Sequence, residues 1–421
     1  MKTRSAGFIV ALGALAYVSA VSQRSTLGIA SLVATERFHT TAEQLSTLAV
    51  AQLAVYAAMQ IPVGLLLDRY GARLLLAVGA ISMAIGQYLV AFAPNLESAV
   101  AGRMLVGFGD AFTFISMIRL INGWFHGKRA SQLQQWLGNG GQIGQIVSAI
   151  PFSFVLHASG WVTAFAVWAT IALILGIAAW IWIADEPSAT EHQPVILKER
   201  IGLLRESVKL PSTRMAFWVH FTTQSSTTVI VLLWGVPFLE QAEGLPKSTV
   251  VAILSSFVVI GFVFGLLFGQ LCAHRPQWRK LALTSTTTLM LVSWVVLLAY
   301  PGKAPIWLVI GWLVATSMNA PASMVAFDYT RQYVPKKELG STNGFVNIGG
   351  FLATFSMMFV IGVVLDVYYN SVGKAAGLPL YSLDGFRLAF VTVLVVIGFG
   401  LSMYLYNEQL TTKLEQVGRK P

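Results

Sequence analysis

The segment at residues 64–73 reads Gly64-Leu-Leu-Leu-Asp68-Arg69-Tyr70-Gly71-Ala72-Arg73, and long apolar runs flank it on both sides. A helix needs about 20 apolar residues to cross a bilayer, because its backbone N–H and C=O groups must pair with one another where no water is available. The runs at 42–66 and 74–94 meet this requirement. The segment therefore predicts a hairpin of two membrane-spanning helices, closed by a charged loop in which Gly71 suits a tight turn.

The rest of the chain repeats this pattern. Of its 421 residues, 56% are hydrophobic and 11% are charged, so a water-soluble enzyme with a single core is disfavoured. Ten further apolar runs lie near 7–32, 99–123, 131–157, 161–184, 215–240, 248–272, 281–300, 306–331, 341–367 and 386–406. We therefore expect an all-α polytopic membrane protein with twelve transmembrane helices.

The formal net charge of +10 follows the loops, so it does not indicate a nucleic-acid partner. If the N-terminus is cytoplasmic, twenty Lys and Arg residues fall in inner segments and six in outer segments or helix mouths. These six are Arg37, Arg103, Lys247, Lys303, Lys374 and Arg387. The asymmetry predicts cytoplasmic termini in a cell (plasma or inner) membrane. The first apolar run lacks a small-residue cleavage site, so we expect it to be retained as a helix.

The sequence offers no support for cofactor chemistry. The single cysteine, Cys272, excludes an internal disulfide, and the six histidines lack the spacing of zinc ligands. The chain also lacks a Gly-x-x-x-x-Gly-Lys-Ser/Thr loop that would cradle phosphates. We expect a protein that is not an enzyme, binds no metal or cofactor, and draws its energy from an ion gradient.

Two halves with weak internal similarity flank a polar stretch. Residues 185–214 carry three prolines among many charges and are interpreted as a cytoplasmic linker between six-helix bundles at 1–184 and 215–421. Residues 41–69 align with 246–274, and residues 128–141 align with 337–350. Two pseudo-symmetric six-helix repeats are the usual construction of transporters that rock about a site at the membrane midplane.

The segment at 64–73 resembles the signature of the major facilitator superfamily in the loop between helices two and three. Arg103-Met-Leu-Val-Gly107 in the fourth apolar run resembles a second motif of that family. Together with the six-plus-six pattern, the resemblance covers nearly the whole chain. It implies a conformational latch formed by Gly64, Asp68, Arg69, Gly71 and Arg73. The alternative is an ordinary hairpin whose basic residues only set its orientation.

The fifth apolar run is rich in glycine between Gly138 and Gly144. It lacks the Gly-Pro pair that marks the antiporter version of this motif, so the resemblance to efflux antiporters is weakened. Gln142 in this run is a candidate substrate-binding residue, and hydrogen bonding between packed helices is an equal alternative.

Charged residues at membrane depth point to function, because each costs at least ~2.5 kcal/mol unless it is paired or faces water. Arg24 lies about seventeen residues after the start of the first run. In the fourth run, Asp110 follows Arg103 by seven residues, so both lie on one helix face about 10 Å apart along the axis. An arginine fork suits an oxyanion, and a membrane carboxylate suits proton binding.

This arrangement resembles the anion:cation symporter branch of the superfamily, in which the segment Gln23-Arg24-Ser25-Thr26 would hold the substrate arginine. The resemblance implies that Arg24 and Arg103 attract the anion while Asp110 takes the proton. The branch often has an acid directly before the first arginine, whereas this chain has Gln23. A purely structural Arg24–Asp110 pair is the alternative.

Further candidates lie in both halves. Arg119 and Asp328 occupy symmetry-related positions and could form an inner gate, or both could extend to the interface. His220 and Gln224, one turn apart, could contact substrate, or the histidine could be a packed, satisfied side chain.

Three functions remain open at this stage. We favour proton-coupled symport of a small organic or inorganic anion by a monomer in the lipid bilayer. The main alternative is a proton-coupled efflux antiporter for drugs or metabolites, and a non-transporting receptor or scaffold is a remote third.

Overall fold

The computed structural model describes residues 5–125, 127–185, 202, 205–335 and 339–418 of the chain, and all regular structure in these ranges is helical. Contacts divide the chain into two units. Unit 1 consists of residues 1–38 and 47–195, and unit 2 of residues 39–46 and 196–421. The domain boundaries expected from the sequence, 1–184 and 215–421, stay a prediction.

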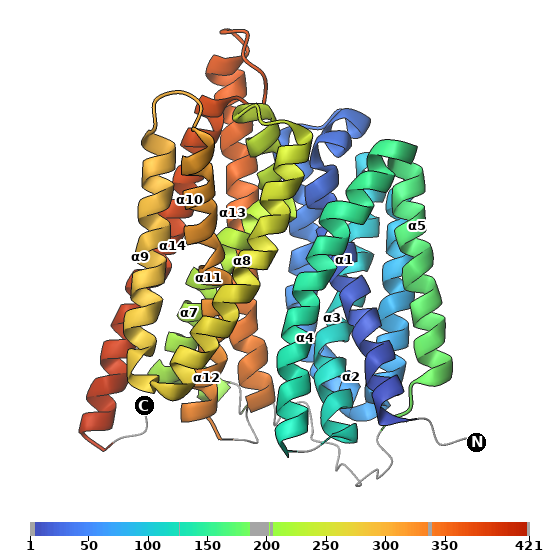
Figure 1. The fold of residues 1–421 in the computed structure, drawn as a ribbon, viewed down its shortest axis with the longest axis vertical. Helices are drawn as coiled ribbons and strands as arrows, with labels where there is room; N and C mark the ends of the chain where they lie inside the picture. Colours follow the sequence, from blue (N-terminus) through green and yellow to red (C-terminus); the bar gives the residue numbers. More distant parts are fainter. Residues whose placement is uncertain (1–4, 126, 186–201, 203–204, 336–338, 419–421) are drawn as a thin grey trace. The chain divides into compact units, whose positions relative to one another are not determined.

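The described part of unit 1 contains five α-helices and one π-helix, with prolines inside α2 and η1 (Figure 1). Its elements are α1 (Ala6–Phe38), α2 (Ala42–Ala91, which begins in unit 2), α3 (Leu96–Trp124), α4 (Gly127–Val147), the π-helix η1 (Ser148–Phe152) and α5 (Ser153–Trp182). Within it, α1 packs against α3, α4 and α5, so it is the central helix of this unit.

Two of these helices contain a turn at a glycine. Gly71 has φ +77° inside α2, and Gly160 has φ +79° inside α5. A side chain is strained at such positive φ values, and glycine is not. The glycines separate the predicted spans 42–66 from 74–94 and 131–157 from 161–184. Helix α2 therefore crosses the bilayer twice, and so does the continuous helical stretch formed by α4, η1 and α5.

Unit 2 consists of further helices connected by short turns. Its α-helices are α7 (Pro211–Val229), α8 (Lys247–His274), α9 (Arg279–Ala299), α10 (Ile306–Ser317), α11 (Asn319–Ala322), α12 (Val325–Tyr333), α13 (Leu339–Tyr368) and α14 (Leu383–Gln416). The π-helices η2 (Ile230–Trp234), η3 (Pro237–Ala242) and η6 (Tyr369–Gly373) extend α7 and α13, and the 3₁₀-helix η4 (Pro276–Trp278) precedes α9. Here α7 packs against α12, α13 and α14.

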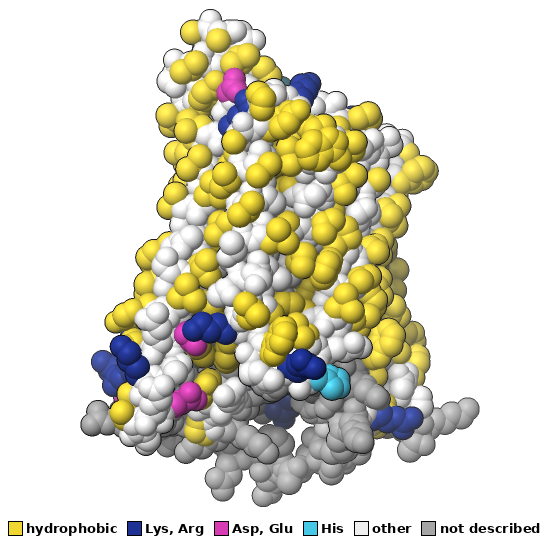
Figure 2. Space-filling view, turned by 60° about the vertical axis from the view of Figure 1, so that its left-hand side comes forward, with side chains coloured by type: hydrophobic (Ala, Val, Ile, Leu, Met, Phe, Trp, Pro, Cys, Tyr) yellow, Lys and Arg dark blue, Asp and Glu magenta, His cyan; other side chains and the backbone are white. Residues whose placement is uncertain are grey.

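The described helices account for twelve membrane crossings. Ten are long and apolar enough to span by composition, and one of these, Gly140–Trp182, contains the turn at Gly160. Helix α7 supplies the remaining crossing, and its seven consecutive polar residues at 222–228 make it less apolar than the other spans. On the face drawn in Figure 2, hydrophobic side chains cover the middle, and Lys and Arg gather mainly towards one end. The protein is therefore an all-α polytopic membrane protein.

Close helix approach at glycine holds α2 and α3 together in unit 1. A Cβ atom added at Gly109 would lie 2.3 Å from the carbonyl oxygen of Gly79, and one added at Gly79 would lie 2.7 Å from that of Gly109. Small residues at such crossings let backbones approach closely, which is the main source of packing energy between helices in lipid. Asp110 follows Gly109 directly on α3, so this crossing fixes the position of Asp110 relative to α2.

The first turn of α2 belongs to unit 2 and is fixed there by Asp366 of α13. The two carboxylate oxygens of Asp366 accept hydrogen bonds from the backbone N–H groups of Ala42 and Glu43, each at 2.8 Å. These N–H groups have no partner inside their own helix, and the positive end of the helix dipole favours a carboxylate. Asp366 therefore caps a helix that is distant in the sequence.

Replacing Gly109 with alanine should destabilise the protein, because the new methyl group would force α2 and α3 apart. Overpacking of this kind costs about 1–3 kcal/mol, and we expect the unfolding temperature in detergent to fall by several degrees.

The matched control is Gly398→Ala in α14, where an added Cβ meets no described atom within 4 Å. Alanine is a better helix former than glycine, so this variant should unfold at the same or a higher temperature. An unchanged unfolding temperature for Gly109→Ala would contradict the close approach.

Candidate functional site

A buried ion pair lies in unit 1 between α1 and α3. The guanidinium of Arg24 donates from Nε to Asp110 Oδ2 at 2.6 Å and from Nη2 to Asp110 Oδ1 at 2.9 Å. The Arg24 side chain is 15% exposed and that of Asp110 is fully buried. A bidentate pair of this geometry is among the strongest side-chain contacts, and the attraction is stronger in the low-dielectric interior than in water.

Arg103 lies on the same face of α3 and is 1% exposed. Its hydrogen bonds go to uncharged oxygens of α1. Nη1 donates to the carbonyl of Gln23 at 3.4 Å and to the hydroxyl of Thr26 at 3.2 Å, and Nη2 donates to the carbonyl of Arg24 at 3.0 Å. The structure therefore places Arg103 in the seam between the two helices, where it holds the backbone that carries Arg24.

Among the described residues, the cluster formed by Arg24, Arg103 and Asp110 contains two basic groups and one acidic group. Asp110 is close enough to interact with both arginines, so one carboxylate serves two guanidinium groups. Arg103 Nε, moreover, is buried and has no hydrogen-bond partner among the described residues. Charge at membrane depth is costly, and an anion near two guanidinium groups would lower that cost.

Aromatic and amide side chains that sequence reasoning missed complete the surroundings of Arg24. The ring of Tyr56 lies 4.9 Å from the guanidinium carbon of Arg24, in cation–π geometry. Gln87 is fully buried and donates to Thr26 and to the Gln23 carbonyl. One sequence signal could have identified Tyr56. Polar side chains recur every four residues in the apolar run 42–66, at Gln52, Tyr56 and Gln60, and so share one helix face.

The Gln23 side chain turns towards α5. Its Nε2 donates to the backbone carbonyl of Trp168 at 2.6 Å, and the Trp168 indole donates to the Ser22 hydroxyl at 2.8 Å. The position at which the symporter branch often carries an acid is therefore a structural contact between α1 and α5 in this chain.

The predicted latch residues surround the turn in α2. The backbone N–H of Arg73 donates to Asp185 at 3.0 Å, and its Nε donates to the carbonyl of Trp180 at 2.8 Å. A Cβ at Gly71 would lie 2.6 Å from Asp185 Oδ2, so this approach requires glycine. Asp185, expected at the start of the linker, thus caps the second part of α2.

The remaining latch residues are placed as follows. Arg69 is exposed, with its guanidinium over the Tyr70 ring at 5.1 Å. A Cβ at Gly64 meets no described atom within 4 Å. The side chain of Asp68 lies outside the described part of the chain. The latch role stays a prediction.

In unit 2, His220 packs between α7 and α13. Its Nδ1 accepts the backbone N–H of Gly350 at 3.2 Å, its ring is 2% exposed, and it contacts the Phe327 ring edge-on at 5.2 Å. Gln224 is half-buried on the same side of α7, next to Gly350. In this conformation the histidine is a satisfied core side chain, so a substrate contact by either residue stays a prediction.

Three other candidates are distributed over both units. Gln142 is half-buried on α4, the helix that packs against α1. Arg119 lies on α3 in unit 1 and Asp328 on α12 in unit 2, and their pairing in an inner gate stays a prediction. Among the described residues, no three His, Cys, Asp or Glu side chains gather as metal ligands would.

Removing the carboxylate by Asp110→Asn should lower the unfolding temperature in detergent, because it leaves two buried cations without an acid. Breaking a buried pair in this way costs about 3–5 kcal/mol. The double variant Arg24→Met, Asp110→Asn should recover a large part of the loss, because one of the cations is then absent.

Asp384→Asn is the control for this experiment. Asp384 forms an exposed pair with Arg387 at 3.1 Å, and such pairs contribute less than about 1 kcal/mol. If Asp110→Asn and Asp384→Asn unfold at the same temperature, the ion pair is not a structural centre of unit 1.

Comparison with known proteins gives consistent matches over most of the chain. Residues 13–358 match the family model described as Major Facilitator Superfamily. The probable galactarate/D-glucarate transporter of Escherichia coli K12 is 23% identical over 387 residues, covering 83% of this chain and 86% of that protein. The probable sulfoacetate transporter of Cupriavidus necator is 22% identical over 389 residues, covering 87% and 88%.

A solved structure matches the fold over nearly its full length. The bacterial homologue of the human lysosomal transporter Spinster, in an inward-facing and unoccupied conformation, superposes with a TM-score of 0.79 at 12% sequence identity. The match covers 98% of this chain and 99% of that one. At this identity the similarity concerns the fold alone.

Proposed function

Because this chain belongs to the major facilitator superfamily, a family of membrane transporters and not of enzymes, we propose that it carries a small anion together with a proton by alternating access. The observation that carries the proposal is the cluster of two arginines and one carboxylate at membrane depth in unit 1. Two relatives named above are probable transporters of organic anions, which supports the same substrate class.

The coupling follows from competition for one guanidinium. In the structure, Asp110 occupies the Nε and Nη2 donors of Arg24, which are the donors that an oxyanion would use. Protonation of Asp110 removes its negative charge and weakens its hold on Arg24. The freed donors then bind the anion. The negative charge of the anion offsets the positive charge of Arg24 and Arg103, which remains after Asp110 is protonated. Proton binding therefore favours anion binding, and the two leave together for the same reason.

Arg103 acts in this proposal as a positioning residue. Its guanidinium is held by α1 oxygens on both sides of Arg24, so it fixes the α1 backbone while the Arg24 side chain exchanges partners. Its positive charge also adds to the attraction of the cluster for an anion. We further propose that the protein acts as a monomer in a cell (plasma or inner) membrane, and the loop charges favour cytoplasmic termini.

The experiment uses proteoliposomes loaded with a pH-sensitive dye, to which D-glucarate, sulfoacetate or p-toluenesulfonate is added outside. Proton-coupled symport should acidify the lumen for at least one of these anions. Arg24→Gln should reduce the initial rate at least ~30-fold, the equivalent of about 2 kcal/mol lost with a charge-paired contact.

Asp110→Asn should abolish lumen acidification but retain exchange of labelled for unlabelled anion, because the neutral amide no longer needs a proton to release Arg24. Lys247→Gln is the control: this exposed residue forms a 3.8 Å pair with Glu240 outside the cluster and should leave both rates unchanged. Acidification that survives in Arg24→Gln would refute the anion site, and lumen alkalinisation driven by lipophilic cations would favour the efflux antiporter.

A further inference from the structure

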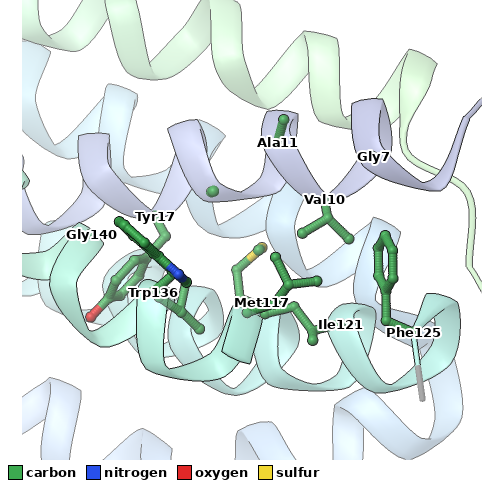
Figure 3. Close-up of a pocket in the computed structure, with 12 residues that line it drawn as sticks. Gly7, Val10, Ala11, Tyr17, Met117, Ile121, Phe125, Trp136 and Gly140 are labelled. Carbon is green, nitrogen blue, oxygen red and sulfur yellow. The ribbon is translucent and has the colours of Figure 1, made fainter. Parts of the chain in front are cut away.

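A cavity of about 210 Å³ lies within unit 1, between the N-terminal half of α1, the C-terminal part of α3, and α4. Val10, Ala14 and Tyr17 line it from α1, Met117 from α3, and Leu137 and Trp136 from α4. In Figure 3, Tyr17 and Trp136 lie at one end of the group, Met117 in its middle and Phe125 at the other end. The mouth at the Phe125 end is also lined by Arg129, whose guanidinium lies 6.0 Å from the Phe125 ring.

The lining of this cavity does not suit a polyhydroxy anion, which needs many hydrogen-bond partners. Among the described residues that line it, the Tyr17 hydroxyl and the Trp136 indole N–H are the only polar side-chain groups. A sugar acid placed there would leave several hydroxyl groups without partners, at a cost of about 1–3 kcal/mol each. An apolar body, in contrast, gains free energy in proportion to the area that it buries.

The closed end of the cavity approaches the charged cluster. Tyr17 precedes Arg24 by seven residues on α1, which is two helical turns, or about 10 Å. The charges of Arg24 and Asp110 act on the Tyr17 hydroxyl, and the Tyr17 ring contacts that of Phe114 at 5.7 Å. The described lining is therefore apolar between Arg129 at the mouth and Tyr17, which lies two turns from Arg24.

We infer that the anion carried by this protein has an apolar body about the size of one substituted ring, which rests between Trp136 and Met117 while its charged group faces Arg24. This inference rests on the proposed anion symport. An apolar cavity of ~150 Å³ holds a benzene ring, so a volume of 210 Å³ is of the right size. Arg129 at the mouth and Arg24 two turns beyond Tyr17 both favour an occupant with an anionic group over a neutral lipid chain.

Trp136 is the residue that would select the ring. Its side chain is 68% exposed, and it lines both the cavity and its mouth. A planar aromatic substrate would cover this exposed indole, with a gain from ring–ring contact in addition to burial. Ala14 lies on the opposite wall, where its small side chain leaves the space open.

The test compares p-toluenesulfonate with methanesulfonate, which has the same charged group without a ring, and with D-glucarate in dye-loaded proteoliposomes. We expect p-toluenesulfonate to acidify the lumen at a half-saturating concentration at least tenfold lower than either comparison anion. Trp136→Ala should raise that concentration about tenfold for p-toluenesulfonate and leave methanesulfonate unchanged. Ala14→Trp, which fills the cavity, should block p-toluenesulfonate selectively.

Two matched controls come from the same protein. Trp307→Ala removes an equally exposed tryptophan of α10, at 67% exposure, and Leu15→Trp adds an indole to α1 beside Ala14 at a position that does not line the cavity. Both should leave the preference for p-toluenesulfonate intact. Loss of transport of all anions to the same extent in Ala14→Trp would overturn the inference, because it would indicate a general path or a lipid site.

The outcomes separate this inference from the proposed function. If D-glucarate drives acidification that requires Arg24 while p-toluenesulfonate does not, anion symport stands and the apolar substrate is wrong. If none of the anions acidifies the lumen, both the symport and the inference that rests on it are refuted.

Discussion

A charged side chain in hydrocarbon must be paired, and in unit 1 this constraint is met by the bidentate contact between Arg24 and Asp110. The pair joins α1 to α3, and Arg103 adds three hydrogen bonds from α3 to the backbone and a hydroxyl of α1. The close crossing of α2 and α3 at Gly79 and Gly109 fixes the height of Asp110. The fold and the candidate site therefore depend on the same few contacts.

The need to pair each buried charge also determines how the pair would act in transport. A carboxylate that holds a guanidinium between two packed helices competes with any anion that needs the same donors. Because the cluster has two cations and one acid, either protonation or anion binding changes its charge balance, and the two changes compensate each other. The apolar cavity that ends at Tyr17 adds a second requirement, which concerns the body of the substrate and not its charge.

Much of the architecture follows from composition and local pattern. The twelve spans and the breaks near 71 and 160 follow from apolar runs interrupted by glycine and charge, because a bilayer allows few backbone conformations. The family follows from the motifs at 64–73 and 103–107 together with the six-plus-six pattern. Helix orientation about the axis does not follow from such runs. Sequence spacing therefore identified Arg24, Arg103 and Asp110 as charges at depth, but not that Arg103 faces the α1 backbone. The sequence also did not predict that Asp185 and Asp366 cap parts of α2, because each carboxylate lies far along the chain from the N–H groups that it binds.

The most direct test of the central claim is to count the protons that accompany anion binding. Calorimetric titration of the purified protein with p-toluenesulfonate, sulfoacetate or D-glucarate, repeated in buffers of different ionisation enthalpy, measures proton uptake per bound anion. Competition between Asp110 and the anion for Arg24 predicts that about one proton is taken up in the native protein, and none in Asp110→Asn. Anion binding without proton uptake in the native protein would contradict the account.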